Sequence, residues 1–241
     1  MEDDIVQISF AGCGGMYHYY LGIAKVLQEN FYLDNVIFGG TSGGCIPALL
    51  LLLEYNIDKV HYDINRKILD EAADSWLGSL FRWNAIARKH LMEFLDHDTH
   101  EKVKGRLYIS MTNIRPYQNE IVSEWTSTED LVHCIQCSSF IPVVFEPKMW
   151  HCHRESRYLD GGLTNNKVTV HSDKPHIYIT TDRWRPNNYN WIWCYSDYLW
   201  AEQLYIWGKE DATKNIHEFA EYLKPREDSL LNFTAALVIK E

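Results

Sequence analysis

Basic residues are scarce in this sequence of 241 residues, which has 23 lysines and arginines against 33 aspartates and glutamates, for a formal charge of −10. This shortage of positive charge argues against nucleic acid as a partner and against purely electrostatic binding to an anionic membrane. The first ten residues, MEDDIVQISF, also lack the basic start of a secretory signal peptide, so we expect none. The six cysteines are few and scattered, which favours free thiols in a reducing, intracellular compartment.

The sequence also lacks an uninterrupted hydrophobic run long enough to span a membrane. Residues 36–53 carry no charge, but four glycines, a proline and a serine interrupt them. A strand, a tight turn and a buried helix therefore fit this stretch better than a transmembrane helix. The sequence contains no internal repeat and no low-complexity linker, and its length is enough to bury a core. We expect a single domain over residues 1–241.

The order of the elements predicts an α/β fold. Residues 5–10 and 35–38 are apolar like buried strands, and each is followed by glycines and then by a helical pattern, at 16–30 and 46–55. A repeated strand–turn–helix order is typical of a parallel sheet. Further along, the pattern predicts helices over 58–104, 126–139 and 196–223, and strands over 106–113, 119–125 and 176–180.

Two glycine-rich turns follow the first two predicted strands. In the first, Gly12, Gly14 and Gly15 surround Cys13, and backbone N–H groups at such a turn can bind a phosphate or an oxyanion. Close packing alone would also explain these glycines. In the second, the stretch FGGTSGGC places Ser42 in a G-x-S-x-G turn, which exposes a nucleophilic hydroxyl in hydrolases.

A third segment, RYLDGGLTNN, places Asp160 before two glycines. Taken alone, Asp-Gly is a common turn sequence. Together with the exposed serine and the anion-binding turn, it offers a carboxylate that could be the base a nucleophilic serine needs. Burial would have to raise the pKa of that carboxylate from about 4 toward the working pH.

These three segments, in this order, resemble those of the patatin-like phospholipases, and most of all the adiponutrin-type branch. The matching stretches are SFAGCGGMYHYYLGIAKVL, FGGTSGGCIPALL, and CSSFIPVVFEP followed by RYLDGGLTNN, within about residues 5–170. The resemblance implies a three-layer α/β/α fold with a mostly parallel central sheet, to which residues 171–241 add a C-terminal strand and helices. It also implies a Ser–Asp dyad that needs no catalytic histidine, no metal and no cofactor.

Matched residue by residue, the resemblance makes Ser42 the nucleophile and Asp160 the base. The residues with backbone roles would be Gly40 and Gly44 in the nucleophile turn, Gly161 and Gly162 in the aspartate loop, and Gly12, Cys13, Gly14 and Gly15 in the oxyanion hole. The glycine loop departs from the family at two positions. Met16 stands where plant patatins have a basic residue, and Tyr17 stands where the loop usually ends in glycine.

The resemblance implies a lipid acyl hydrolase of the phospholipase A or acylglycerol lipase type, which cleaves carboxylic esters of glycerolipids or phospholipids through an acyl-enzyme. The substrate would lie at a membrane or lipid-droplet surface, and the protein would be cytoplasmic, with or without peripheral attachment to that surface. The Trp-rich stretches 76–83 and 191–207 fit either a core or a lipid-contacting surface, for which Trp76, Leu77 and Phe81 are the candidates.

Two alternatives concern the activity itself. The chain could be a catalytically silent lipid-binding or interaction protein that keeps the fold. It could instead be a conventional Ser-His-Asp hydrolase, since His171, His176 and His217 all follow Asp160 in the sequence. No residue context singles out one of these histidines.

A third alternative is a zinc site. Cys134 and Cys137 lie three residues apart on a predicted helix and so face one side, and His151, Cys152 and His153 follow. The same segment, however, matches the family's helix end before the aspartate loop. We therefore expect no metal.

Overall fold

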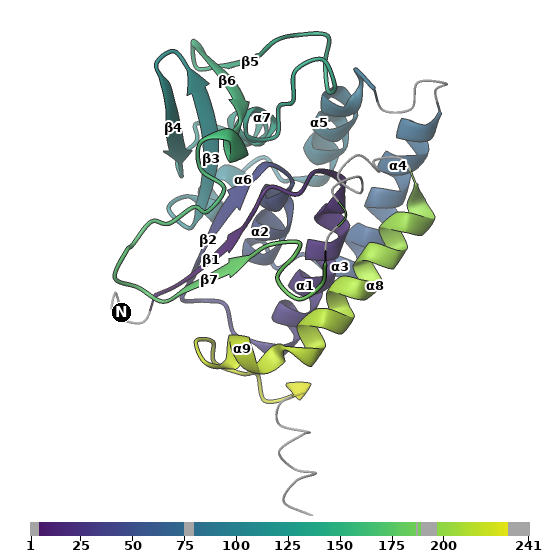
Figure 1. Cartoon of the computed structure of the whole chain (residues 1–241), viewed down its shortest axis with the longest axis vertical. Coiled ribbons are helices and arrows are strands. Elements are labelled where there is room, and N and C mark those ends of the chain that lie inside the picture. Colours follow the sequence, from purple (N-terminus) through teal and green to yellow (C-terminus); the bar gives the residue numbers. More distant parts are fainter. Residues whose placement is uncertain (1–4, 75–79, 187, 189–196, 231–241) are drawn as a thin grey trace, which may run out of the picture.

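The computed structural model describes residues 5–74, 80–186, 188 and 197–230 (Figure 1). Its strands are β1 (Val6–Phe10), β2 (Val36–Thr41), β3 (Leu107–Ile114), β4 (Tyr117–Val122), β5 (His151–His153), β6 (Ser156–Asp160) and β7 (His176–Ile179). Its main helical segments are α1 (Tyr17–Asn30), α2 (Cys45–Leu52), α3 (Ile57–Lys59), the π-helix η3 (Val60–Asn65), α4 (Arg66–Ala73), α5 (Trp83–Phe94), α6 (Thr99–Val103), α7 (Thr128–Ser138), α8 (Tyr198–Lys214) and α9 (Ile216–Ala220).

The seven strands of the described residues form one mixed sheet in the order β5-β6-β3-β2-β1-β7, with β4 also paired to β3. Strands β7, β1, β2 and β3 run parallel, whereas β4 and β6 run antiparallel to β3. Strands β1 and β2 are buried along their whole length, as expected for parallel strands covered on both faces. Helices lie on both sides of the sheet (Figure 1). The predicted α/β fold with a mostly parallel central sheet is confirmed.

Strand β3 brings the ends of two other strands together. Its first half pairs with β2 and its second half with β6, while β4 overlaps both pairings and so occupies the opposite edge. Because β2 is parallel and β6 antiparallel to β3, their C-terminal ends meet. Thr41 lies opposite Ser110, and Asp160 lies opposite the next residue, Met111. The turns that follow β2 and β6 therefore start next to each other, beside the middle of β3.

The helical pattern predicted over residues 58–104 is confirmed for the described residues of this range, which form several separate helical segments. The break after α5 has a visible cause. Leu95 has extended backbone, and Thr128 Oγ1 lies 2.9 Å from the next two carbonyl oxygens, of Asp96 and His97, which share its one proton. A side chain of α7 therefore takes up carbonyl groups that a continuing helix would have bonded.

The β5–β6 hairpin is a second difference, since the sequence analysis placed Asp160 on a loop and predicted no strand there. The two strands pair antiparallel across Arg154 and Glu155, whose φ angles are 44° and 65°. Two positive φ values in a two-residue turn match the twist of a hairpin, but asparagine and glycine are the usual residues there. The Arg-Glu pair gives no such signal, so the sequence did not predict the strand β6, which ends at Asp160.

The segment that follows the three motifs packs onto the rest of the fold. Helix α8 lies along α1 (Figure 1). The hydroxyl of Tyr19 on α1 donates to the carboxylate of Asp211 on α8 at 3.0 Å, and Arg185 donates to both oxygens of the same carboxylate at 2.9 Å. Among the helices of the described residues, none is both long enough and apolar enough to cross a bilayer.

Candidate active site

Ser42 occupies a strained turn between β2 and α2. It begins the 3₁₀ turn η2 (Ser42–Gly44), and its φ of 53° lies in the left-handed region that side chains rarely adopt. Its N–H donates to Ser138 Oγ at 2.8 Å, and that hydroxyl donates to the carbonyl oxygen of Ser110 at 2.7 Å. Strand β3 and helix α7 thus hold the turn in the conformation that a G-x-S-x-G nucleophile requires.

The glycines of this turn allow the first strand to approach it. A Cβ on Gly44 would stand 2.4 Å from the carbonyl oxygen of Phe10 and 2.6 Å from that of Ala11, closer than any real contact. A Cβ on Gly40 would likewise meet the backbone of Cys45. The glycines of this motif are therefore needed for packing, while Ser42 itself is buried at the wall of a pocket.

Asp160 is held next to Ser42 by both strand pairing and loop contacts. Its N–H donates to the carbonyl oxygen of Phe140 at 3.0 Å, and its own carbonyl accepts from Thr112 Oγ1 at 2.8 Å. Its carboxylate accepts the N–H of Gly162 at 2.8 Å and lies near enough to the Ser42 side chain for that hydroxyl to lower its pKa. Ser42 and Asp160, paired by the sequence motifs, are thus neighbours in the structure.

Burial changes the acidity of Asp160. Desolvation of the carboxylate raises its pKa from 3.8 to about 6, although the hydrogen bonds from Ser42 and from the Gly162 N–H oppose the rise. A carboxylate with this pKa is still mostly ionised at neutral pH, yet it accepts a proton far more readily than an exposed aspartate. Those are the properties of a general base.

The glycine loop packs beside the nucleophile turn and continues as the 3₁₀ turn η1 (Gly14–Met16). Gly14 has a φ of 53° and lines the same pocket as Ser42. The side chain of Cys13 is buried, and burial, followed by the nearby Asp160 carboxylate, raises the pKa of its thiol well above 9. This thiol is therefore neutral and is no rival nucleophile.

The four predicted oxyanion donors are not equivalent. The N–H of Gly12 already donates to Asn166 Oδ1 at 2.6 Å, which leaves the N–H groups of Cys13, Gly14 and Gly15 as candidates. The two residues that depart from the family pattern, Met16 and Tyr17, have different surroundings. Met16 is buried in the core, and Tyr17 lines the pocket beside Ser42.

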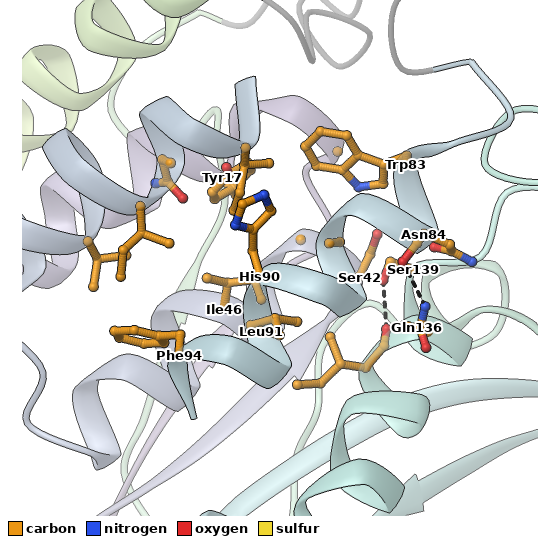
Figure 2. Close-up of a pocket in the computed structure, with 18 of the residues that line it drawn as sticks. Tyr17, Ser42, Ile46, Trp83, Asn84, His90, Leu91, Phe94, Gln136 and Ser139 are labelled. Atoms are coloured by element: carbon orange, nitrogen blue, oxygen red, sulfur yellow. Dashed lines mark hydrogen bonds between the residues drawn. The ribbon is translucent and has the colours of Figure 1, made fainter. Parts of the chain in front are cut away.

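A mostly apolar pocket opens beside Ser42 (Figure 2). Its cavity volume is about 90 Å³, which is small beside typical ligand sites, and the space around it opens to solvent. Its walls come from α2, η3, α4, α5 and α7, and from the loop after α7. Its apolar lining is Ile46, Leu50, Val60, Ile64, Ile68, Trp83, Ala87, Leu91, Phe94, Ile135 and Phe145.

The competing histidine assignments find no support at this site. The ring of His176 is hydrogen-bonded to Ser9 Oγ at 2.7 Å and faces Thr169 Oγ1 at 3.4 Å. In the described parts of the chain, neither His171 nor His217 lines the pocket. None of the three histidines of the Ser-His-Asp alternative is thus found at the described pocket wall, and His90, which does line it, has its ring hydrogen-bonded to Glu71 at 2.8 Å.

The zinc alternative finds no set of ligands among the described residues. Cys134 lies against the sulfur of Met111, and Cys134 and Cys137 are both buried in the core. Within residues 5–74, 80–186, 188 and 197–230, no three His, Cys, Asp or Glu side chains are arranged to hold a metal ion. The five described cysteines are free thiols, as predicted.

Of the residues proposed for lipid contact, Trp76 and Leu77 lie outside the described residues, whereas Phe81 is exposed. Of the second Trp-rich stretch, Trp200 and Trp207 are partly buried and pack against the core, while residues 191–196 are not described.

Sequence reasoning missed two residues that organise the site, Ser138 and Asn166. Ser138 accepts the N–H of the nucleophile turn, and Asn166 accepts an N–H of the glycine loop. Both belong to segments that the sequence analysis quoted, CSSF and TNN, but a serine or asparagine in a polar stretch gives no signal of a partner far along the chain. The pocket lining was equally hidden, because it comes from scattered helical residues.

Comparison with known proteins defines the class of protein. The family model described as patatin-like phospholipase matches residues 8–171, about two thirds of the chain. The chain belongs to the patatin-like phospholipase family, and its curated relatives are consistent with the adiponutrin-type branch.

The particular relatives include patatin-like phospholipase domain-containing protein 2 of Homo sapiens, 34% identical over 169 residues, which cover 66% of this chain and 32% of the relative. Another is 1-acylglycerol-3-phosphate O-acyltransferase Pnpla3 of Mus musculus, 30% identical, with coverage of 66% and 40%. The chain thus spans well under half the length of either. Among solved structures, VipD from Legionella pneumophila matches 73% of this chain and 49% of its own, with a TM-score of 0.41 and 13% identity.

Proposed function

We propose that this protein is a serine lipid acyl hydrolase that cleaves carboxylic esters of glycerolipids with Ser42 as nucleophile and Asp160 as base. The observation that carries the proposal is the contact between a serine in a strained turn and a carboxylate with a pKa of about 6, at the wall of an apolar pocket. Family membership and relatives named as phospholipase and acyltransferase support the same class of reaction.

In the proposed first step, Asp160 takes the proton of the Ser42 hydroxyl while Ser42 Oγ attacks the ester carbonyl carbon. The carbonyl oxygen becomes an oxyanion, which N–H groups of Cys13 and Gly14 can stabilise. The bond to the alcohol oxygen then breaks, and Asp160 returns its proton to that oxygen. Water attacks the acyl-serine in the second half, Asp160 accepts a proton from the water, and Ser42 takes this proton back as the free acid leaves.

The pocket would hold the acyl chain of the substrate. Most of the surface that lines it is apolar, and burial of each CH₂ group of an alkyl chain contributes about 0.8 kcal/mol to binding. Helix α5 supplies much of this wall, with Trp83 and Leu91 among its lining residues (Figure 2). Ile68 of α4 also lines the pocket. The apolar lining therefore favours an ester whose acid carries a hydrocarbon chain.

The test of the nucleophile is Ser42→Ala, compared with Ser139→Ala. Ser139 also lines the pocket, but its hydroxyl donates to the carbonyl oxygen of Ile135 at 2.6 Å. A fluorophosphonate probe should label the wild type and Ser139→Ala but not Ser42→Ala, and ester hydrolysis should follow the same pattern. Full hydrolysis by a folded Ser42→Ala variant would disprove the proposed function. Absence of hydrolysis in all three proteins would favour the silent lipid-binding alternative.

We further propose that substrate reaches the pocket from a lipid surface across an apolar rim formed by Leu80, Phe81 and Val143. These side chains are 37%, 38% and 51% exposed, and the N–H of Phe81 donates to the carbonyl oxygen of Val144 at 2.9 Å. The two loops thus lie side by side, and a residue of the pocket wall, Trp83 or Phe145, stands two positions after Phe81 and Val143.

Phe81→Ser and Val143→Ser should therefore slow the hydrolysis of lipids in vesicles more than that of a soluble short-chain ester. Tyr117→Ser is the matched control, because Tyr117 is 66% exposed on the β3–β4 hairpin and does not line the pocket. Equal losses on both substrates would show that the rim serves folding rather than lipid contact.

A further inference from the structure

Asn166 links the aspartate loop to the glycine loop. Its side-chain oxygen accepts the N–H of Gly12 at 2.6 Å, although the two residues lie 154 positions apart in the sequence. Because Gly12 offers an N–H donor, the oxygen of the amide must face it, which fixes the orientation of the side chain. The contact therefore joins the first and third motifs directly, beside the second.

The backbone around Asn166 is tied down on both sides. The carbonyl oxygen of Asn166 accepts the hydroxyl of Tyr178 on β7 at 3.1 Å. The carbonyl oxygen of Asn165 accepts from Ser110 Oγ at 2.8 Å and from Thr41 Oγ1 at 3.3 Å, at the point where β2 ends. Asn166 is thus positioned by the same strands that position the proposed dyad.

The amide oxygen of Asn166 also lies very close to the reacting groups. A Cβ on Gly12 would stand 3.1 Å from this oxygen and 3.3 Å from Ser42 Cβ. A Cβ on Gly162 would stand 3.5 Å from the same oxygen and 3.1 Å from Asp160 Oδ1. A side chain at position 12 or 162 would crowd these groups, so the Asn166 side chain lies between the three motifs.

We infer that Asn166 is a positioning residue for the oxyanion hole. By holding the N–H of Gly12, it fixes the start of the glycine loop so that the following N–H groups, of Cys13 and Gly14, face the carbonyl oxygen bound at Ser42. Gly12 is then an anchor of the loop rather than an oxyanion donor. This inference rests on the proposed hydrolase function.

The test compares Asn166→Ala and Asn166→Asp with Asn165→Ala. Loss of the anchor should lower kcat for a soluble ester by about 10-fold to 10²-fold, somewhat less than removal of a direct oxyanion donor, while KM changes little. Affinity for a trifluoromethyl ketone, which forms a tetrahedral adduct with the serine, should fall by a similar factor. The Asn165 side chain bonds Lys167 N–H and Asn119 instead, so Asn165→Ala should stay within about threefold of wild type.

Asn166→Asp separates positioning from general structure. It keeps an oxygen to accept the Gly12 N–H, but adds a negative charge close to Asp160, which should raise the pH midpoint of kcat/KM above that of the wild type. Activity should therefore recover partly at alkaline pH. Amide hydrogen exchange at Gly12 should be faster in Asn166→Ala and remain slow in Asn166→Asp, a readout that does not depend on turnover.

The outcomes separate this inference from the proposed function. An active Ser42→Ala variant would overturn the hydrolase assignment whatever Asn166 does. With Ser42→Ala inactive, a folded Asn166→Ala variant that keeps both kcat and inhibitor affinity within about twofold would overturn the inference. If Asn166→Ala fails to fold, a folded Asn166→Asp variant with an unshifted pH midpoint and unprotected Gly12 amide would overturn it instead.

Discussion

Asp160→Asn should make the protein more stable at pH 8 while abolishing most of its activity. The folded state raises the pKa of this carboxylate from 3.8 to about 6, so the unfolded chain ionises it more easily than the folded protein does. Its contribution to the free energy of unfolding is therefore complete below about pH 4 and is lost as the pH rises through about 6. At pH values above that range, a pKa shift of this size lowers the free energy of unfolding by at most about 3 kcal/mol.

Asparagine removes the buried charge and keeps an oxygen for the Gly162 N–H, while its NH₂ group can donate to Ser42 Oγ. Urea unfolding of Asp160→Asn and wild type at a series of pH values measures the difference directly. We expect the variant to gain up to about 3 kcal/mol at pH 8, with the gain shrinking toward zero near pH 4.

Asp130→Asn is the matched control with the opposite sign. Burial alone would raise the pKa of Asp130, but hydrogen bonds from Arg154 and from the N–H of Thr126 outweigh it and hold this pKa at about 2. The folded state thus favours the ionised form, and Asp130→Asn should lower stability at pH 8. If Asp160→Asn is instead less stable than wild type at pH 8, or if its gain is the same at every pH, the assigned desolvation of Asp160 is wrong.

Three further predictions follow from the same geometry. Because Asp160 must be ionised to act as base, kcat/KM on a soluble ester should rise about tenfold per pH unit below about 6 and level off above it, and a midpoint near 4 would contradict this role. Gly44→Ala would place a methyl group 2.4 Å from the carbonyl oxygen of Phe10, so thermal unfolding should show a loss of about 1–3 kcal/mol or more, together with loss of probe labelling. His176→Gln can keep the contact with Ser9 and should retain most esterase activity; an inactive but folded variant would revive the Ser-His-Asp alternative.

The sequence by itself determined the local structure of the first half of the site. The alternation of apolar strands, glycine turns and helical segments in residues 5–55 predicts β1, α1, β2 and α2 nearly as they stand, because periodicity and glycine act over a few neighbouring residues. Ser42 stands out for the same reason. Its catalytic role, like that of Asp160, the single-domain organisation and the cytoplasmic location, stays a prediction.

Only the tertiary structure decided what lies next to Ser42. The meeting of β2 and β6 on one edge of β3 depends on strand pairing between distant segments, which no local pattern specifies. The Arg154–Glu155 turn has no sequence signal of a hairpin, so the strand that carries Asp160 was not predicted. The N–H of Gly12 is bonded to Asn166 and is therefore not available as the oxyanion donor that the motif suggests. The rise in the pKa of Asp160 has the same origin, because desolvation depends on every element packed around the carboxylate.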